Sequence, residues 1–168
     1  MAALWRQGIV YVLYRSATEK VHRDIYLLKS LDRGRTFDGS DISQWNVGYC
    51  VMSSESFAES PAGVLAAWET EKQVYFGRID PGPGKLSTIA AAGSTDNRKY
   101  PAVAANTKGE MIFAWTEGMG WKKGGSVAWQ VYDKEGRPTQ ERGKMGGVPV
   151  WSLVAAYARP DGGFTVVY

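Results

Sequence analysis

A strand-like stretch, Ile25-Tyr26-Leu27-Leu28-Lys29-Ser30, runs directly into Leu31-Asp32-Arg33-Gly34-Arg35-Thr36-Phe37. The first part is rich in aromatic and aliphatic residues, which suit a pleated, half-buried surface. In the second part, Asp32 can bind its own backbone and Gly34 accepts a positive φ angle, as tight turns require. The stretch therefore predicts a strand that ends in a tight turn.

The same strand-and-turn unit recurs twice along the chain. Gln73–Ile79 leads into Asp80-Pro81-Gly82, and Ser126–Tyr132 leads into Asp133-Lys134-Glu135-Gly136. Each unit follows another strand that closes on an aromatic residue. Those strands are Val10–Arg15, Val64–Glu69 and Met111–Thr116, and Thr165–Tyr168 has the same pattern. The closing aromatics stand at positions 14, 68, 115 and 168, spaced by 54, 47 and 53 residues, which indicates an internal repeat.

Two further strand types complete the repeat. One is rich in small residues and begins near Cys50, Tyr100 and Val150, at a spacing of 50 residues each time. We interpret its members as innermost strands, because small side chains fit where strands converge; they are Cys50–Phe57, Tyr100–Asn106 and Val150–Tyr157. The other type follows the Asp-Gly turns, over residues 36–42, 85–91 and 138–144, and is the weakest of the four.

The order of inner, second, third and outer strand over roughly 50 residues is typical of a β-propeller blade. We therefore predict an all-β fold of three four-stranded propeller blades, in one domain over residues 1–168. Blade 1 is expected over about 1–45, blade 2 over about 49–93, blade 3 over about 99–145 and closing strands over about 149–168. Unrelated hairpins in a β-sandwich are the alternative, and the equal spacing of three strand types argues against it.

The turn after the quoted strand carries a family resemblance. Ser30-Leu31-Asp32-Arg33-Gly34-Arg35-Thr36-Phe37 matches the Asp-box motif, Ser-x-Asp-x-Gly-x-Thr-Trp/Phe, at every defined position. It resembles the motif of the sialidase-like (BNR-repeat) β-propellers, and the turns at Asp80 and Asp133 look like degenerate copies. In that family the Asp box is structural and folds the turn between the third and fourth strands, away from the active site. The resemblance implies that the motif residues serve the fold rather than catalysis.

The resemblance also bears on assembly, since family sialidases are six-bladed and this chain has about half of that. An open arc of three blades would expose apolar flanks too large for a soluble monomer. Before the second-type strand Ile9–Arg15, only Met1–Trp5 is a possible inner strand, whereas Val150–Tyr157 and Phe164–Tyr168 are additional strands at the other end. We therefore expect a homodimer that closes a six-bladed ring, with the C-terminal strands of each chain completing the partner's first blade. A fragment of a longer protein is the alternative.

Composition narrows the classes of partner. Lys and Arg total 20 against 17 Asp and Glu, a net charge of +3, and form no block of like charge. Neither nucleic acid nor a membrane surface is therefore an expected partner. No apolar run approaches the ~20 residues of a membrane span, and Met1–Arg6 lacks the layout of a signal peptide. A soluble protein is expected, and its compartment stays open, because a single cysteine excludes only an intrachain disulfide.

Strand order predicts which loops share the face that carries the active site in the similar family. They are residues 15–23, 45–50, 69–72, 94–100, 117–125 and 146–151. The only histidine, His22, and the only cysteine, Cys50, both belong to this face, in neighbouring blades. A Cys50 nucleophile with His22 as base and Asp24 or Glu69 as orienting group would attack activated esters or phosphoesters. This predicts a small-molecule hydrolase with its site in the central funnel.

Other residues of the same face would support that chemistry. Arg15, Arg98 or Lys99 would stabilise the anion that develops in the reaction. Plainer interpretations stay open, since Cys50 is equally suited to a buried apolar position and His22 to holding a loop.

A glycosidase or sialidase is an alternative that the resemblance raises. Its mechanism needs an Arg cluster, an Asp acid/base and a Tyr–Glu nucleophile pair, and no Arg-Ile-Pro segment occurs in the chain. Tyr100 is a candidate catalytic residue on the expected face, although Tyr100-Pro101 is equally suited to packing the ring centre. Glu69 and Glu117 also lie on that face, but none of these residues aligns with the family's roles.

The remaining alternative is a non-catalytic glycan- or ligand-binding propeller. Aromatic faces stack on sugar rings and other flat apolar ligands, and the rim carries Trp45, Tyr49, Tyr100, Trp121 and Trp151. The expected ligand-binding residues are Arg15, Glu69, Arg98, Lys99, Glu117 and Trp151. No cofactor and no metal site is predicted, because one histidine cannot build a His-rich zinc centre. The carboxylates of Asp24, Glu69 and Glu117 are nevertheless of the kind that holds Ca²⁺.

Overall fold

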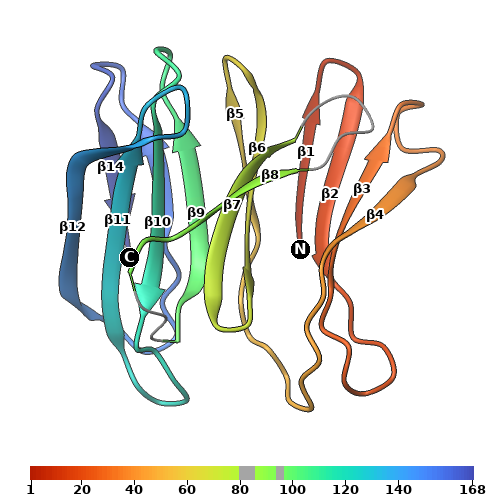
Figure 1. Ribbon diagram of the computed structural model, residues 1–168, viewed down its shortest axis with the longest axis horizontal. Coiled ribbons are helices and arrows are strands. Elements are labelled where there is room, and N and C mark those ends of the chain that lie inside the picture. Colours follow the sequence, from red (N-terminus) through yellow and green to blue (C-terminus); the bar gives the residue numbers. More distant parts are fainter. Residues whose placement is uncertain (80–85, 94–96) are drawn as a thin grey trace.

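Four antiparallel β-sheets stand side by side along the chain in the computed structural model, which describes residues 1–79, 86–93 and 97–168. Three of them are four-stranded and the last has two strands. Figure 1 shows the three four-stranded sheets in a row, in the order of the sequence, with the two-stranded sheet behind the third. The all-β fold and the three blade-like sheets predicted from the repeat are confirmed. The described residues contain no helix long and apolar enough to cross a membrane.

The first sheet pairs four consecutive strands. They are β1 (Ala2–Arg6), β2 (Ile9–Arg15), β3 (Ile25–Ser30) and β4 (Asp38–Ser43). β1 pairs with β2 from Ala2–Leu13 to Arg6–Ile9, so this sheet has an inner strand of its own. The expected lack of a strand at the N-terminal end is therefore not observed. The first sheet already has four strands of this chain, so the prediction that a partner's strands complete it is wrong.

The later sheets repeat this order. The second contains β5 (Ser56–Ser60), β6 (Gly63–Thr70), β7 (Gln73–Ile79) and β8 (Ser87–Ala90). The third contains β9 (Lys99–Ala105), β10 (Met111–Glu117), β11 (Gly125–Tyr132) and β12 (Pro138–Val148), and β13 (Ala155–Ala158) pairs with β14 (Phe164–Val167) in the last. The first strands of successive sheets lie side by side, since β1 contacts β5, β5 contacts β9 and β9 contacts β13. They are therefore the inner strands, as the repeat predicts.

Two inner strands begin later than expected. β5 starts at Ser56 rather than Cys50, because the preceding residues make side-chain contacts instead of a ladder: Ser53 Oγ accepts the backbone N–H of Tyr100, and Glu55 pairs with Arg15. β13 starts at Ala155 rather than Val150. Trp151, in the segment before it, has a φ of 68°, which is outside the range of an extended β-strand.

The core lies between the sheets rather than inside any one of them. Trp68 of β6 packs with apolar residues of the first sheet. Phe76 of β7 meets Phe113 of β10 and Tyr132 of β11, at ring-centroid distances of 4.8 and 4.9 Å. Burying aromatic side chains of this kind is worth about 3–5 kcal/mol each, judged from their truncation to alanine. The sheets are thus stabilised face to face, in the manner of neighbouring blades.

The turn between β3 and β4 is closed by the carboxylate of Asp32. Asp32 Oδ1 accepts the backbone N–H groups of Arg35 and Thr36, both at 2.9 Å, and Oδ2 accepts the Thr36 hydroxyl at 2.7 Å. Ser30 Oγ donates to Asp32 Oδ1 at 2.8 Å and accepts the Gly34 N–H at 2.7 Å. The hydrogen bonds from Thr36 and Ser30 lower the pKa of Asp32 to about 2. These four residues hold the turn, as expected of them.

The turn at Asp133 is built in a similar way. Asp133 repeats part of the pattern, because its Oδ1 accepts the N–H groups of Glu135 and Arg137 at 3.0 and 2.8 Å. The Asp80-Pro81-Gly82 turn lies outside the described residues.

Candidate functional site

The loops expected to share one face do lie together. Figure 1 shows the β2–β3, β6–β7 and β10–β11 loops at its lower end, with the connections from β4 to β5 and from β12 to β13. The turn of Asp32 lies at the opposite end. The predicted separation of the two faces is therefore confirmed for these segments.

A hollow of about 260 Å³ opens among these loops. We call it the loop hollow; it is lined by Tyr49, Cys50, Met52, Asn97, Lys99, Tyr100, Met119, Gly120, Trp121 and Trp151. Four of the residues proposed from the sequence meet there, namely Cys50, Lys99, Tyr100 and Trp151. Cys50 comes from the connection between β4 and β5, Lys99 and Tyr100 from the start of β9, and Trp151 from the entry to β13.

Two tryptophans form one rim of the loop hollow. The rings of Trp121 and Trp151 meet edge to face with centroids 4.7 Å apart, and the residues remain 73% and 47% exposed. Indole rings are usually buried in the core of a protein or in an interface, so two exposed ones side by side are unusual. The pair therefore presents apolar surface toward solvent beside a concave region.

Tyr100 is held in the wall of the hollow by a bulge in β9. The ladder to β10 shifts by one residue between Lys99–Thr116 and Ala102–Ala114, which leaves Tyr100 and Pro101 opposite Trp115. Tyr100 has a φ of 51°, a conformation that costs a non-glycine residue of order 1–3 kcal/mol. Its backbone N–H is bound by Ser53 Oγ at 3.2 Å. Bulges of this kind re-aim side chains, and they are common beside functional sites.

A buried carboxylate lies near this wall. Glu69, at the end of β6, is fully buried, and neither of its carboxylate oxygens has a hydrogen-bond partner among the described residues. Burial raises the pKa of Glu69, and the nearby Ser53 hydroxyl and the Lys99 and Arg15 cations oppose that shift. The negative charge of Glu69 in turn adds to the effect of burial in raising the pKa of Tyr100.

Arg15 occupies in β2 the position that Glu69 occupies in β6, directly after the closing aromatic. Its guanidinium donates to the backbone carbonyl of Glu69 at 2.5 Å and to that of Arg23 at 2.8 Å. It also lies 5.5 Å from the ring centroid of Trp45 and 3.9 Å from Glu55 Oε1. Arg15 therefore ties the first sheet to the second.

His22 and Asp24 form a separate group in the β2–β3 loop. His22 Nδ1 lies 3.6 Å from Asp24 Oδ2, and Nε2 lies 3.5 Å from Glu19. Asp24 Oδ1 accepts the backbone N–H of Trp45 at 2.9 Å, which fastens the loop to residues 44–50. Cys50 is exposed, and no hydrogen bond joins it to His22 or to any other described residue. The structure thus brings His22 to Asp24 but does not connect either to Cys50.

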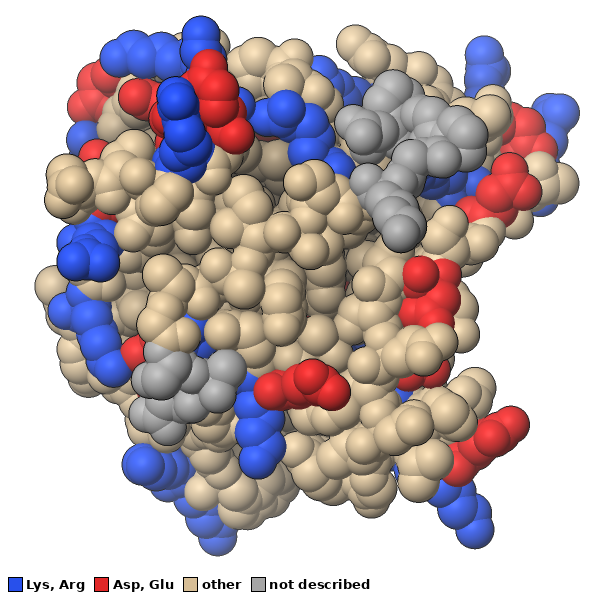
Figure 2. All heavy atoms as spheres, in the orientation of Figure 1, with Lys and Arg blue, Asp and Glu red and all other residues tan. Residues whose placement is uncertain are grey.

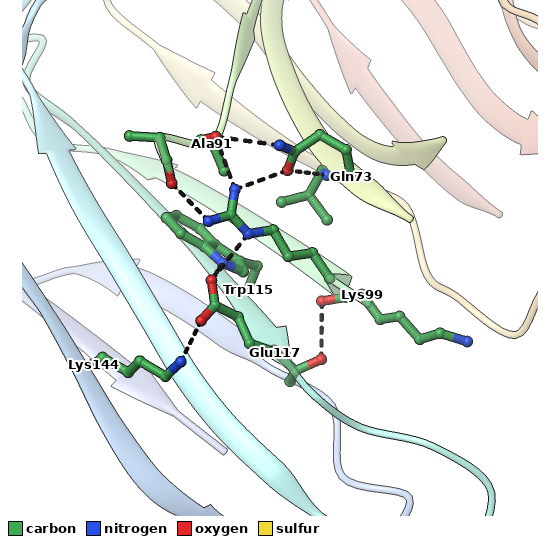
Figure 3. A network of polar contacts seen from close by, with 10 residues as sticks. Gln73, Ala91, Lys99, Trp115, Glu117 and Lys144 are labelled. Atoms are coloured by element: carbon green, nitrogen blue, oxygen red, sulfur yellow. Dashed lines mark hydrogen bonds and ion pairs between the residues drawn. The ribbon is translucent and has the colours of Figure 1, made fainter. Parts of the chain in front are cut away.

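Arg98 and Glu117 meet away from the loop hollow. Arg98 Nε donates to Glu117 Oε1 at 2.9 Å, and Lys144 Nζ donates to Oε2 at 2.6 Å (Figure 3). Burial raises the pKa of Glu117, but the hydrogen bonds from Lys144 and Trp115 and the charge of Arg98 outweigh it, so the pKa is lowered. The two residues proposed as separate ligand contacts therefore bind each other.

No group of three or more His, Cys, Asp and Glu side chains that could hold a metal ion occurs among the described residues. The carboxylates considered for Ca²⁺ do not share a partner. Asp24 binds the backbone of Trp45, Glu117 binds Arg98, and the carboxylate of Glu69 has no hydrogen-bond partner among the described residues.

Ser53, Asn97 and Met119 join the site without having been singled out in the sequence. Asn97 Nδ2 donates to the carbonyl of Met119, which ties the entry to β9 to the β10–β11 loop. Ser53 lay in a stretch expected to be a strand. Nothing in the local pattern identifies these residues, because their contacts reach across different sheets.

The chain matches no protein-family model and no curated protein.

Proposed function

We propose that this protein is a ligand-binding module that takes a sugar ring, or a flat apolar ligand of similar size, in the loop hollow. The observation that carries the proposal is the exposed Trp121–Trp151 pair on the rim, 4.7 Å between centroids. Aromatic faces stack on such ligands, and binding sites are typically concave and apolar with a few polar groups. Here Lys99 and Asn97 supply the polar groups.

A glycan titration tests this proposal. Amide chemical shifts would be followed while N-acetylneuraminic acid, N-acetylglucosamine or glucose is added, since these sugars differ in charge and substituents. Trp121→Ala and Trp151→Ala are expected to weaken binding about two- to tenfold each, the loss of one aromatic contact. Trp5→Ala is the matched control, because Trp5 is also exposed but lies on β1, outside the hollow. Equal affinity in all four proteins would refute the assignment.

A small-molecule hydrolase in the same hollow is the second candidate. The observation that favours it is that Cys50 is exposed and lines the hollow together with Lys99 and Tyr100. A Cys50 thiolate would attack the carbonyl of an activated ester, and the Lys99 ammonium would stabilise the tetrahedral anion. Collapse of that anion would expel the alcohol and leave a thioester, which water would hydrolyse to the acid and the free thiol. His22 would need to approach Cys50 by movement of the β2–β3 loop to act as the base.

Substitution separates catalysis from binding. Hydrolysis of p-nitrophenyl acetate, an aryl phosphotriester and an aryl glycoside would be measured for the parent protein, Cys50→Ala and His22→Ala. The hydrolase proposal expects loss of esterase activity in Cys50→Ala with sugar binding intact. Turnover that survives both substitutions would eliminate these residues as catalysts, and glycoside turnover would favour the glycosidase alternative.

We further propose that the three sheets are blades of a sialidase-like propeller that closes by pairing with a second copy. The Asp32 turn and the adjacent inner strands support the blade assignment. An apolar groove of about 310 Å³ beside β14, lined by residues such as Trp129, Phe164 and Val166, supports an uncompleted ring. The contact would join whole sheet faces, since the first sheet already has four strands. Sedimentation equilibrium tests this, and a stable monomer at micromolar concentration would refute it.

A further inference from the structure

A second hollow lies between the second and third sheets, on the side of their outer strands. β8 has four residues whereas β12 has eleven, so the described outer strand of the second sheet is much shorter than that of the third. The resulting crevice has a volume of about 420 Å³. We call it the inter-sheet crevice; Ala92 and Gly93 form one wall, and Trp115, Ala128, Gln130 and Arg142 contribute to the other. None of its described lining residues also lines the loop hollow.

One end of the crevice is formed by a network of hydrogen bonds around Glu117 and Arg98. Glu117 accepts hydrogen bonds from Arg98 Nε, Trp115 Nε1 and Lys144 Nζ at 2.9, 2.8 and 2.6 Å. Arg98 in turn donates to Gln73 Oε1 and to the carbonyls of Ala91 and Ala92 (Figure 3). The carboxylate is thus saturated with donors, and it presents little charge to a molecule entering the crevice.

The charges that remain are positive. Among the described lining residues, the three cationic side chains of Arg98, Arg142 and Lys144 stand against the carboxylate of Glu117, a surplus of two positive charges. Arg142 is exposed, and its guanidinium has no hydrogen bond or ion pair with the described residues. Figure 2 shows Lys and Arg side chains along its left edge, where β12 runs in Figure 1. A free guanidinium beside an ammonium favours an anion, and its planar fork fits a carboxylate.

Gln130 supplies a fixed acceptor in the same place. Its Nε2 donates to the carbonyls of Val131, Thr139 and Glu141, which sets the orientation of the amide. The side-chain carbonyl oxygen then has no hydrogen-bond donor among the described residues, although the residue is only 4% exposed. The β11–β12 ladder pairs Gln130 with Arg142, so both side chains stand on the same face of the sheet.

We propose that the inter-sheet crevice binds a small organic carboxylate with a flat apolar body and a hydrogen-bond donor at its far end. Arg142 holds the carboxylate, with Lys144 beside it. The apolar body lies along Trp115 and Ala128. Gln130 Oε1 accepts the hydrogen bond from the donor. This site is independent of the one proposed at the loop hollow.

The test uses 4-hydroxybenzoate as the probe and 4-hydroxybenzamide as its neutral counterpart, with amide chemical shifts as the readout. Saturable shifts are expected at Ala128, Gln130 and Gly143, with Kd weakened about tenfold in Arg142→Ala, the loss of one charged contact. Arg35→Ala is the matched control, since it removes an exposed arginine from the distant Asp32 turn. Trp121→Ala should leave this binding unchanged, which separates the crevice from the loop hollow.

Four results would overturn the proposal. They are the absence of saturable shifts, shifts confined to the loop hollow, unchanged affinity in Arg142→Ala, and equal affinity for the benzamide. The spectrum of Arg142→Ala itself reports whether that variant keeps the fold.

Discussion

Arg98 and Glu117 form a hydrogen-bonded ion pair of 2.9 Å, with side chains only 4% and 10% exposed. Arg98 precedes β9 and Glu117 ends β10, while the other donors of Arg98 reach Gln73 and Ala91 of the second sheet. The pair therefore fastens the second sheet to the third at their outer side. A buried guanidinium with four acceptors is satisfied only while all of them stay in place.

Removing the carboxylate from this pair should strongly destabilise the protein. Glu117→Ala leaves the Arg98 cation buried without its partner, and breaking such a pair costs about 3–5 kcal/mol. Urea denaturation measures the change in the free energy of unfolding. Lys144→Ala is the control, because the Lys144 side chain is 55% exposed and its ion pair should contribute only about 0–1 kcal/mol. Similar losses in both variants would contradict the assigned role of Arg98.

The hydrogen bonds of the Asp32 turn should make the stability of the fold decrease at low pH. The folded-state pKa is about 2, below the ordinary carboxyl value, because Thr36 and Ser30 donate to the carboxylate. A lowered folded pKa means that the stabilisation is present above the unfolded pKa and is lost as pH falls through the folded value. Thermal unfolding of the parent protein should therefore lose stability from about pH 4 toward about pH 2 more steeply than that of Asp32→Asn.

Asp38→Asn is the control for that comparison, since Asp38 is an exposed residue of β4, just beyond the turn. It should retain the acid dependence of the parent protein. An identical pH profile in Asp32→Asn would show that the turn's hydrogen bonds do not stabilise the fold.

The sequence predicts the second and third strands of each sheet well because their information is local. Alternating apolar residues that run into an Asp-Gly turn define Ile25–Ser30 and its repeats without reference to the rest of the chain. The inner strand β5 could not be placed in this way. Its beginning depends on Ser53 binding the Tyr100 N–H, a contact between residues 47 positions apart.

For the candidate site, the sequence predicted only which loops lie at the same end of the molecule. Loop order was sufficient to bring Cys50 and Trp151 to the same end of the molecule. It could not separate Arg98 from Lys99, neighbours in sequence that line different hollows. Consecutive side chains of an extended segment point to opposite sides, and contacts with other sheets decide which hollow each of the two residues meets.

Replacing Glu69 by glutamine should stabilise the protein at neutral pH. Burial raises the folded-state pKa of Glu69, so folding becomes less favourable as pH rises from the unfolded carboxyl value through that raised pKa. Glutamine stays neutral and removes this penalty. Thermal unfolding should show a higher midpoint for Glu69→Gln above the ordinary carboxyl range and convergence with the parent protein in acid. A lower midpoint at every pH would show that the charged carboxylate is needed.

Two glycines of β12 provide a matched test of how closely this strand packs on β11. A Cβ added at Gly143 would lie 2.3 Å from Cζ2 and 2.7 Å from Cη2 of Trp129, whereas one added at Gly146 meets nothing within 4 Å. The Trp129 indole is partly buried and packs against the core cluster that contains Ile112 and Val131, so a shift of the ring disturbs that packing.

Gly143→Ala should therefore lower the free energy of unfolding by about 1–3 kcal/mol, the usual cost of overpacking. Gly146→Ala should be neutral or stabilising by up to roughly 1 kcal/mol, since alanine loses less backbone entropy on folding than glycine. Urea denaturation of the two variants measures the difference directly. Trp fluorescence should also change in Gly143→Ala alone, because only there must an indole ring shift. Equal stabilities would mean that β12 separates from β11 without cost, and that the wall formed by Arg142 and Lys144 is not fixed in place.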